Sequence, residues 1–261
     1  MTLLDRCDTG AVAHIRMISP GNLNALSDAM IAALQDELDG IAATTDIRAV
    51  VLSGEGKAFC AGHDLKEMTA GRQADDGGAG YFADLFSRCA RLMTTITHLP
   101  QPVIAAPHGI ATAAGCQLVA SCDMAVAAQS TRFGVNGVNI GLFCSTPMVA
   151  LSRNIPRKHA FEMLTTGRFI DTERAQSLGL INQTVPDGAH EDAALQLAEV
   201  VAAKLGSAVR IGKEAFYRQI EMTLADAYEY TGTVMVQNML NPDTEEGIAA
   251  FIEKRSPNWS Q

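Results

Sequence analysis

Two short segments rich in glycine and alanine carry the pattern most able to do chemistry. They are Phe59-Cys60-Ala61-Gly62-His63-Asp64-Leu65 and the stretch from Gly109 to Gln117, and each leads into a predicted helix. The first N–H groups of a helix have no partner within it, and the helix dipole is positive at that end. Such a place favours an anion or an oxygen that gains negative charge. Two of these helix starts at one point would form an oxyanion hole, although such turns more often serve only tight packing.

Side chains near these segments offer acid–base or nucleophilic groups, each with a structural alternative. His63 could transfer a proton or simply pack, and Asp64 stands where a carboxylate caps a helix. Cys144 could be reactive, but a buried and inert thiol is the favoured interpretation. Asn136 and Asn139 could hold a water molecule by hydrogen bonds, and a role in shaping their loop is favoured. We therefore expect structural roles for most of these side chains.

Metal and nucleotide motifs are absent from the sequence. The six cysteines form no C-x-x-C pair, which favours buried, reduced thiols over a zinc site. Neither glycine-rich segment matches a Walker P-loop or the G-x-G-x-x-G dinucleotide fingerprint. We therefore predict neither a metal site nor a separate cofactor.

Length and composition indicate one large globular domain, or a domain with a smaller addition. The chain has 261 residues, of which 48% are hydrophobic and 19% charged. Its net charge of −9 would repel nucleic acid and anionic membranes, so neither is expected as a partner. The start, MTLLDRCDTG, lacks the apolar run of a secretory signal and the arginines of a transit peptide. The sequence therefore predicts a cytoplasmic location.

Hydrophobic patterning predicts two regions of different character. Up to about residue 185, short buried strands alternate with helices, which is typical of an α/β architecture with mostly parallel strands. The predicted strands cover 11–19, 48–53, 103–106 and 123–128, and the predicted helices 27–43, 81–96, 113–122 and 147–153. Residues 69–80 and 132–139 are predicted as loops, and the first of these is a candidate lid.

From about residue 191 the pattern is helical to the end. Apolar stripes recur in 195–205, 211–220, 224–240 and 244–254. These helices cannot bury all their apolar surface against one another, so they must pack on the α/β part or on another subunit. We therefore divide the chain into a core of residues 1–190 and a helical region of residues 191–261, and expect a homo-oligomer.

Four segments together resemble the crotonase superfamily, also called the enoyl-CoA hydratase/isomerase family. RAVVLSGEGKAFCAGHDLKEM (48–68) is similar to its first signature and HGIATAAGCQLVASCDMAVA (108–127) to its second. PGNLNALS (20–27) and EEGIAAFIEKR (245–255) resemble its two ends, so the likeness covers nearly the whole chain. It resembles most the branch called enoyl-CoA hydratase domain-containing proteins. The resemblance implies a spiral of ββα units, a C-terminal helical trimerisation region, and a trimer or a dimer of trimers.

The resemblance also implies the ligand and its contacts. An acyl-CoA thioester would be bound with its carbonyl oxygen between the backbone N–H groups of His63 and Ala114, with coenzyme A entering only as part of the substrate. Lys254 matches a lysine that reaches the coenzyme A phosphate of a neighbouring subunit. The remaining contacts that the resemblance implies for coenzyme A are Ala25, Ala61, His63, Asp64, Leu65 and Lys66.

Two positions depart from the hydratase pattern. A hydratase of this family uses two glutamates, and the matching positions here are Gln117 and Gly137. An amide does not exchange a proton near pH 7 and glycine has no side chain, so conventional hydration should be very slow. The resemblance therefore favours enolate stabilisation without a strong base, as in decarboxylation or a slow lyase step; AGHD also occurs in a branch similar to methylmalonyl-CoA decarboxylase. A catalytically retired acyl-CoA-binding protein and a purely structural oligomer are the alternatives, and the acyl chain length stays open.

Overall fold

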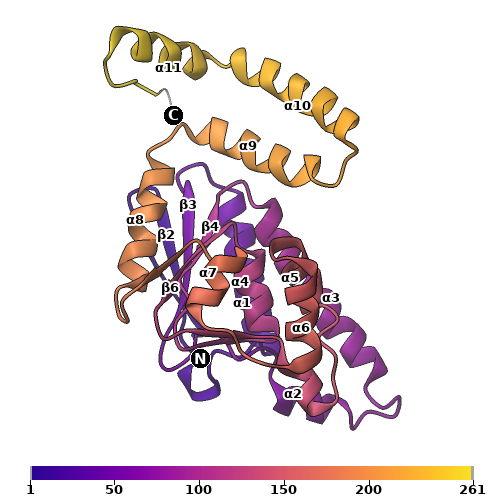
Figure 1. Cartoon of the computed structure of the whole chain (residues 1–261). Coiled ribbons are helices and arrows are strands. Elements are labelled where there is room, and N and C mark those ends of the chain that lie inside the picture. The colour runs from indigo at the N-terminus through magenta and orange to yellow at the C-terminus, as the bar shows by residue number, and fades with distance from the viewer. Residues whose placement is uncertain (1, 260–261) are drawn as a thin grey trace.

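The computed structural model describes residues 2–259, and its centre is a six-stranded sheet (Figure 1). The strand order is β1-β2-β3-β4-β6-β8, with β1 antiparallel to β2 and every other neighbouring pair parallel. The six strands are β1 (Leu4–Thr9), β2 (Val12–Met17), β3 (Ala49–Gly54), β4 (Val103–Ala105), β6 (Met124–Ala128) and β8 (Gln183–Val185). Parallel neighbours require crossovers through helices, as the alternation in the sequence predicts.

Helices cover both faces of this sheet. In Figure 1, α8 lies on one side of the strands and α1, α3 and α4 lie on the other. The helices of the layered body are α1 (Asp28–Ala42), α2 (Leu65–Gly71), α3 (Ala79–His98), α4 (Ala114–Ser121), α5 (Pro147–Asn154), α6 (Arg157–Thr166), α7 (Thr172–Leu178) and α8 (His190–Ala202), with 3-10 turns η1 (Pro20–Asn22) and η2 (Asn136–Ile140). The mixed α/β class predicted from the sequence is therefore the class observed.

A second, smaller ladder runs beside the large sheet and gives the chain its spiral course. Isolated backbone bridges join successive turns of the chain: Leu26 pairs with His63, Cys60 with Ala111, and Phe133 with Ile170. Between these bridges, the parallel strands β5 (Ile110–Thr112) and β7 (Arg132–Gly134) pair with each other. Successive turns of the spiral therefore bring residues 60–63 directly beside residues 110–114.

Two predicted loops contain regular structure. The predicted loop 132–139 holds strand β7 and the start of η2, and the predicted loop 69–80 is shortened by α2 and α3 to residues 72–78. There the Asp76 carboxylate accepts the N–H groups of Gly78 and Gly80, each at 2.8 Å, and closes the turn. Strands β5 and β7 have three residues each and lack the continuous apolar run that revealed the equally short β4, which explains why they were not predicted.

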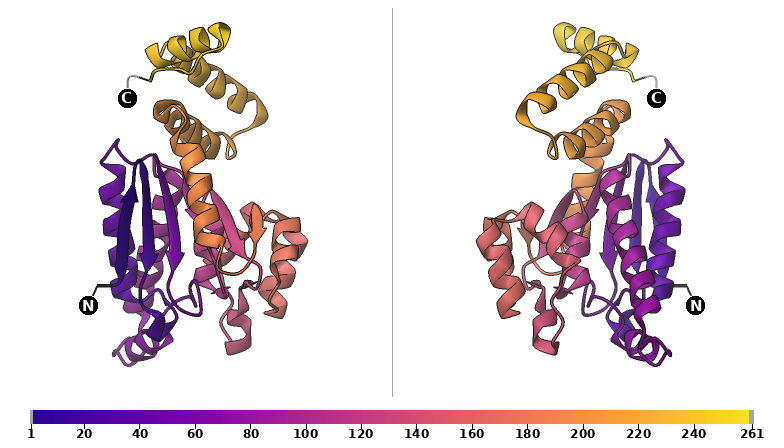
Figure 2. Two further views of the ribbon diagram at one scale, coloured as in Figure 1. Left: turned by 90° about the vertical axis from the view of Figure 1, so that its left-hand side faces the viewer. Right: turned by 90° about the vertical axis from the view of Figure 1, so that its right-hand side faces the viewer.

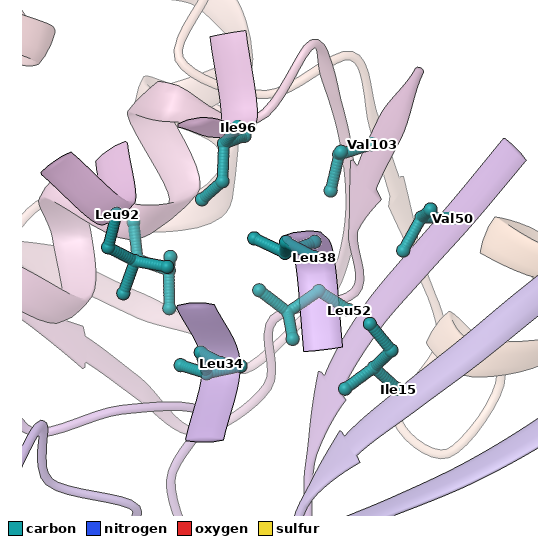
Figure 3. A pocket seen from close by; sticks show the side chains of 9 residues that line it. Ile15, Leu34, Leu38, Val50, Leu52, Leu92, Ile96 and Val103 are labelled. Atoms are coloured by element: carbon teal, nitrogen blue, oxygen red, sulfur yellow. The ribbon is translucent and has the colours of Figure 1, made fainter. Parts of the chain in front are cut away.

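The main core lies between the sheet and the face covered by α1, α3 and α4. Figure 3 shows side chains from α1, α3 and the strands converging on a cavity of only about 10 Å³. Ligand pockets measure roughly 300–1,000 Å³, so this is a packing void with no room for a substrate. The residues that line it are Ile15, Leu34, Leu38, Val50, Leu52, Leu92, Ile96, Val103 and Leu118. This void is therefore not a candidate ligand site.

Three C-terminal helices extend beyond the layered body, as Figures 1 and 2 show. They are α9 (Gly206–Gln219), α10 (Leu224–Met239) and α11 (Pro242–Glu253). By contrast, Ala194, Ala198 and Ala202 of α8 join Val51 and Ile104 of the strands in a second apolar cluster. Our division at residue 190 stays a prediction, and the structure adds that α8 packs on the sheet. Among the described residues, no helix is long and apolar enough to span a membrane.

Candidate functional site

The two glycine- and alanine-rich segments meet at Gly62. Cys60 donates its N–H to the carbonyl of Ile110, and Thr112 donates its own to Cys60, both at 3.1 Å. This pairing continues to Gly62, where a Cβ atom would lie 3.0 Å from the Ala113 Cβ and 3.3 Å from the Ala114 nitrogen. Gly62 has φ +89°, which side chains rarely adopt. Glycine at this position therefore allows the backbone before His63 to approach the start of α4.

Helix α4 begins after an abrupt turn in the backbone. Ala113 has φ 50° and ψ −119°, and its N–H donates to the Gly134 carbonyl at 2.9 Å. That turn leaves Ala114 as the first residue of α4 with a free N–H. Within residues 2–259, neither the His63 N–H nor the Ala114 N–H donates to a backbone or side-chain acceptor. Two unpaired amides, one at the positive end of α4, are therefore brought close together.

The His63 side chain is half-buried, and its environment disfavours the charged imidazolium. Its ring meets Phe86 edge-on with centroids 5.6 Å apart, and its Nε2 atom is buried without a hydrogen-bond partner. Burial lowers the pKa of the imidazole to about 4, against an opposing influence of the Asp28 carboxylate. A neutral imidazole at pH 7 can donate or accept one hydrogen bond at Nε2, depending on its tautomer.

Gln117 lies one turn into α4 and is only 5% exposed. Its N–H donates to the carbonyl of Ala113 at 3.0 Å, and its side-chain Oε1 has no partner. Leaving a buried amide oxygen unpaired disfavours the fold by about 1–3 kcal/mol. In native proteins such a group usually has a partner, so an unpaired one inside a protein needs an explanation.

Gly137 is packed too tightly to carry a side chain. A Cβ atom there would overlap the Leu142 carbonyl oxygen and lie 2.8 Å from the Cys144 sulfur. Burial raises the pKa of the Cys144 thiol, and burial also raises the pKa of the neighbouring Cys116 to about 12. Both thiols are therefore protonated at neutral pH and fit the predicted inert role.

The other polar candidates in these segments have partners. Asp64 caps α2 by accepting the N–H groups of Lys66 at 2.8 Å and Glu67 at 3.4 Å. Asn136 accepts a hydrogen bond of 2.6 Å from the Thr112 hydroxyl. The Asn139 amide donates to the Gly167 carbonyl at 3.4 Å. These contacts agree with the capping and loop roles that we favoured.

The residues expected at coenzyme A divide into buried and exposed groups. Ala25 is buried, and the Ala61 N–H donates to the Leu23 carbonyl at 3.1 Å. Leu65 and Lys66 are exposed and line an open depression of about 500 Å³ on α2 and the turn after it. The structure therefore gathers Ala61 to Lys66 near the two free amides, with an open surface beside them.

Lys254 lies far from this region of its own chain. It ends α11 with φ 55°, in the helices that project from the body. Figure 1 shows α11 and α2 at opposite ends of the molecule. One subunit therefore cannot bring Lys254 to the free amides, and only another subunit could do so.

Asn24 is a residue of the site region that the sequence did not single out. Its fully buried side chain accepts the Ser19 N–H at 2.9 Å and donates to the carbonyls of Glu55 and Ala58 at 2.9 and 2.8 Å. These bonds fix the chain just before Cys60. A lone asparagine among apolar residues in LNALS is the signal that could have revealed it.

Comparison with curated proteins gives consistent relatives. The chain is 45% identical over 249 residues to enoyl-CoA hydratase domain-containing protein 3, mitochondrial, from Xenopus laevis, covering 95% of this chain and 83% of that protein. It is 43% identical to the protein of that name from Homo sapiens, over 95% of this chain and 80% of that protein. The cytoplasmic location predicted from the sequence is contradicted, because these relatives are named mitochondrial. The acidic, apolar-poor start of the chain was therefore no guide to location.

Solved structures and a family model agree with this result. An enoyl-CoA hydratase of Mycobacterium smegmatis matches with a TM-score of 0.95 and 50% identity, covering 100% of both chains. Human enoyl-CoA hydratase domain-containing protein 3 matches with a TM-score of 0.94 and 41% identity, over 99% of this chain and 100% of that one. These likenesses confirm the predicted crotonase-like fold. Since the family model for enoyl-CoA hydratase/isomerase also matches residues 8–261, the chain belongs to that family.

Proposed function

We propose that the chain binds an acyl-CoA thioester with its carbonyl oxygen between the N–H groups of His63 and Ala114. The observation that carries the proposal is the approach of Gly62 to Ala114, which joins two amides without acceptors of their own. Membership of the enoyl-CoA hydratase/isomerase family supplies the ligand class. The two donors come from different turns of the spiral, so their spacing depends on the whole ladder and not on one loop.

The chemistry of this pair of amides is stabilisation of an enolate. When a proton or another group leaves the carbon next to the thioester, negative charge moves onto the carbonyl oxygen. Fixed N–H dipoles stabilise that charge without having to reorganise, and one such donor contributes about 2.7–4 kcal/mol in known enzymes. The protein would therefore lower the barrier mainly through its backbone.

The coenzyme A part of the ligand would follow the exposed start of α2. Ala25, Ala61, Asp64 and Leu65 would provide backbone contacts, and the Lys66 ammonium would lie beside the nucleotide. Lys254 would contact the coenzyme A phosphate bound to a neighbouring subunit, since its own site is out of reach. This assignment needs a homo-oligomer, which the family resemblance predicts as a trimer or a dimer of trimers.

The two positions that replace glutamates offer no acid–base group to the reaction. Gln117 cannot exchange a proton at neutral pH, and Gly137 is enclosed by Leu142 and Cys144. Position 137 is therefore built around glycine, and a glutamate could not be restored there without moving the backbone. We propose an enzyme that relies on enolate stabilisation, with a retired acyl-CoA-binding protein as the alternative if no thioester is turned over.

Matched ligands test the proposed carbonyl site. Calorimetry compares butyryl-CoA with S-butyl-CoA, a thioether that lacks only the carbonyl oxygen. Two hydrogen bonds of ordinary strength predict at least about tenfold tighter binding of the thioester. The infrared stretch of a ¹³C-labelled thioester carbonyl should move to lower frequency on binding. Equal affinities together with an unshifted carbonyl would contradict the proposal.

The Gly62→Ala variant tests whether the carbonyl site depends on the close approach of the two segments. Its methyl group would lie against Ala113 and Ala114 and force the two segments apart. We expect the carbonyl shift to shrink while coenzyme A alone binds as before, with circular dichroism confirming the fold. Turnover of a panel of enoyl-, hydroxyacyl- and malonyl-type thioesters then separates the enzyme from the retired binding protein.

A further inference from the structure

A polar cluster lies beneath the first turn of α8, on the face of the sheet opposite α4 (Figure 1). Most of α8 packs on the strands through alanines, in an apolar cluster. At the start of the helix the contact becomes polar, because Glu191 lies 3.0 Å from Arg16 and 3.9 Å from His14. His14 also shares a hydrogen bond of 2.8 Å with Ser53 on β3. The proposed function uses none of these groups.

Two histidine rings meet at this end of α8. His190, the first residue of the helix, faces His108 with ring centroids 5.1 Å apart. His190 is 9% exposed, and within the described residues neither of its ring nitrogens has a hydrogen-bond partner. His108 donates from Nε2 to the Gly56 carbonyl at 3.0 Å, so in the neutral ring its Nδ1 is a bare acceptor. That Nδ1 is also buried and unpaired, so three ring nitrogens at this contact lack partners.

A proton on His190 is unfavourable while the first turn of α8 is closed. Burial lowers the pKa of the His190 ring, and the neighbouring His108 ring lowers it further. The first residue of a helix also lies at the positive end of the helix dipole, which disfavours a cation. If the turn opened, the His190 ring would reach water and regain an ordinary pKa of about 6.5. Acid therefore favours the open turn.

The other charged groups around His190 oppose this effect without cancelling it. Those that raise its pKa are Asp187, Glu191 and Asp192. Glu191 is already paired with Arg16, and Asp192 is exposed, where solvent screens its charge. Burial also lowers the pKa of His14 on β2, so that ring resists a proton as well. The carboxylates therefore reduce the free-energy cost of a proton on His190 but do not remove it.

We propose that the His108–His190 contact is an acid-sensitive latch, which holds the first turn of α8 on the sheet at neutral pH and releases it when His190 takes up a proton from solvent. The second half of α8 stays in place, because Ala198 and Ala202 pack in the apolar cluster. The latch borders the candidate site, since the His108 carbonyl accepts the Phe59 N–H at 3.0 Å, at the start of the first glycine- and alanine-rich segment. The proposal does not depend on which ligand the protein binds.

Amide hydrogen exchange of the full-length protein measures this opening directly. The amides to follow are those of residues 193–197, beginning with Ala193, whose N–H donates to the Ala189 carbonyl at 3.0 Å. Their protection factors, corrected for the intrinsic exchange rate at each pH, are compared at pH 7.5 and pH 5.5. A ring with an ordinary pKa in the open turn predicts that protection falls about five- to tenfold over this change. It should stay below the protection of α1, which exchanges only when the whole fold opens.

Histidine variants assign the effect to the latch. His190→Phe keeps a ring against His108 but takes up no proton, so it should remove the pH dependence at residues 193–197. His190→Gln is a second variant without a titrating ring, and circular dichroism confirms that both are folded. His108→Gln keeps an amide donor for the Gly56 carbonyl and should reduce the pH dependence, because it removes the ring that opposes a proton on His190. His98→Phe, at an exposed histidine on α3, is the matched control and should keep the wild-type behaviour.

Each outcome decides for or against the latch. Protection at residues 193–197 that is the same at pH 7.5 and pH 5.5 would overturn the proposal. Wild-type pH dependence in the His190→Phe and His190→Gln proteins would also overturn it, because the proton would then act at another group. Loss of the pH dependence in both of these variants, together with its retention in His98→Phe, would establish His190 as the group that releases the turn.

Discussion

Single residues at the site hold neutral groups in buried places, and His63 shows the consequence most clearly. Its pKa is lowered from 6.5 to about 4 by burial, so the unfolded chain takes up this proton before the folded chain does. Stability from this residue is therefore fully present above pH 6.5 and decreases as pH falls toward 4. A difference of this size corresponds to a loss of about 2 kcal/mol by pH 5.

The His63→Phe variant should remove that part of the pH dependence. Urea unfolding at pH 7 and pH 5 measures the free energy of unfolding of both proteins. The wild type should lose about 2 kcal/mol more than the variant between these pH values. His14 and His190 also have pKa values lowered by burial, so they contribute equally to both proteins and cancel in the difference. An identical pH dependence in the two proteins would show that His63 is not held neutral by the fold.

The sequence pointed to the two segments that meet at the candidate site, but not to how tightly their residues are held. Glycine and alanine around His63 and Ala114 mark places where two backbones approach, and that pattern is local. The enclosure of Gly137 is different, because it depends on the turn that brings Leu142 and Cys144 back against it. The unpaired state of Gln117 likewise depends on what surrounds α4 in space. Such facts require the packed structure.

Among the elements, the start of α4 stores strain where the site needs a free amide. Ala113 adopts φ 50° and ψ −119°, a conformation that disfavours the fold by about 1–3 kcal/mol for a residue with a side chain. Glycine adopts this conformation without strain, but its greater conformational entropy in the unfolded chain lowers the free energy of unfolding by about 0.5–1 kcal/mol. Ala113→Gly should therefore stabilise the protein by about 1 kcal/mol, measured by urea unfolding.

Ala111→Gly is the matched control for that variant. Ala111 is buried in β5 and has no positive φ, so glycine there should lower the free energy of unfolding. Opposite signs at positions 111 and 113 would locate the strain at the entrance to α4. A destabilised Ala113→Gly protein would contradict the strained conformation.

Elements that have a capping residue or an apolar face could be predicted from the sequence, and those that have neither were missed. Helix α1 begins after Ser27, whose hydroxyl accepts the Met30 N–H at 3.2 Å, and α2 begins after Asp64 in the same manner. These caps are visible in the sequence, so α1 was predicted within a residue at each end and the start of α2 was expected near Leu65, although its last turn falls in the predicted loop 69–80. Strand β1 was missed because it is an exposed edge strand, LDRCDT, with no apolar face to produce a pattern. Hairpin pairing with β2 across the turn at Gly10 and Ala11, and not an apolar face, makes it a strand.

At the scale of the whole molecule, one buried ion pair joins the projecting helices to the body. Lys213 of α9 donates to Asp123 at 2.7 Å and to the carbonyls of Ile96 and Gln101 at 2.9 and 3.0 Å. Tyr217 of α9 donates to the other oxygen of Asp123 at 2.8 Å. Lys213→Met would leave the Asp123 carboxylate buried with less support, which predicts a loss of about 3–5 kcal/mol in urea unfolding.

A second change distinguishes loss of the pair from loss of packing. Adding Asp123→Asn to Lys213→Met removes the uncompensated charge, so the double variant should be more stable than the single one. Limited proteolysis should cut before α9 faster in Lys213→Met than in the wild type. A single variant that loses less than about 1 kcal/mol would show that the ion pair does not hold α9 in place.

The projecting helices also present large apolar side chains to the outside. Leu240 is 79% exposed and Phe251 is 85% exposed, and Leu224, Tyr228 and Ile252 share this character. Water disfavours contiguous apolar surface of this kind, so we expect a second copy of the chain to cover it. The double variant Leu240→Asp/Phe251→Asp should sediment as a smaller species, while Gln176→Asp, which adds charge on α7, should not change the sedimentation coefficient.

Coenzyme A affinity in the dissociated variant then tests the shared site. If Lys254 contacts the ligand of a neighbouring subunit, the smaller species should bind coenzyme A several-fold more weakly, and the loss should shrink in high salt because a phosphate contact is screened. Lys254→Gln in the intact oligomer should weaken binding by a similar factor. A dissociated variant with full affinity would place every coenzyme A contact within one chain, and would make the oligomer a matter of stability alone.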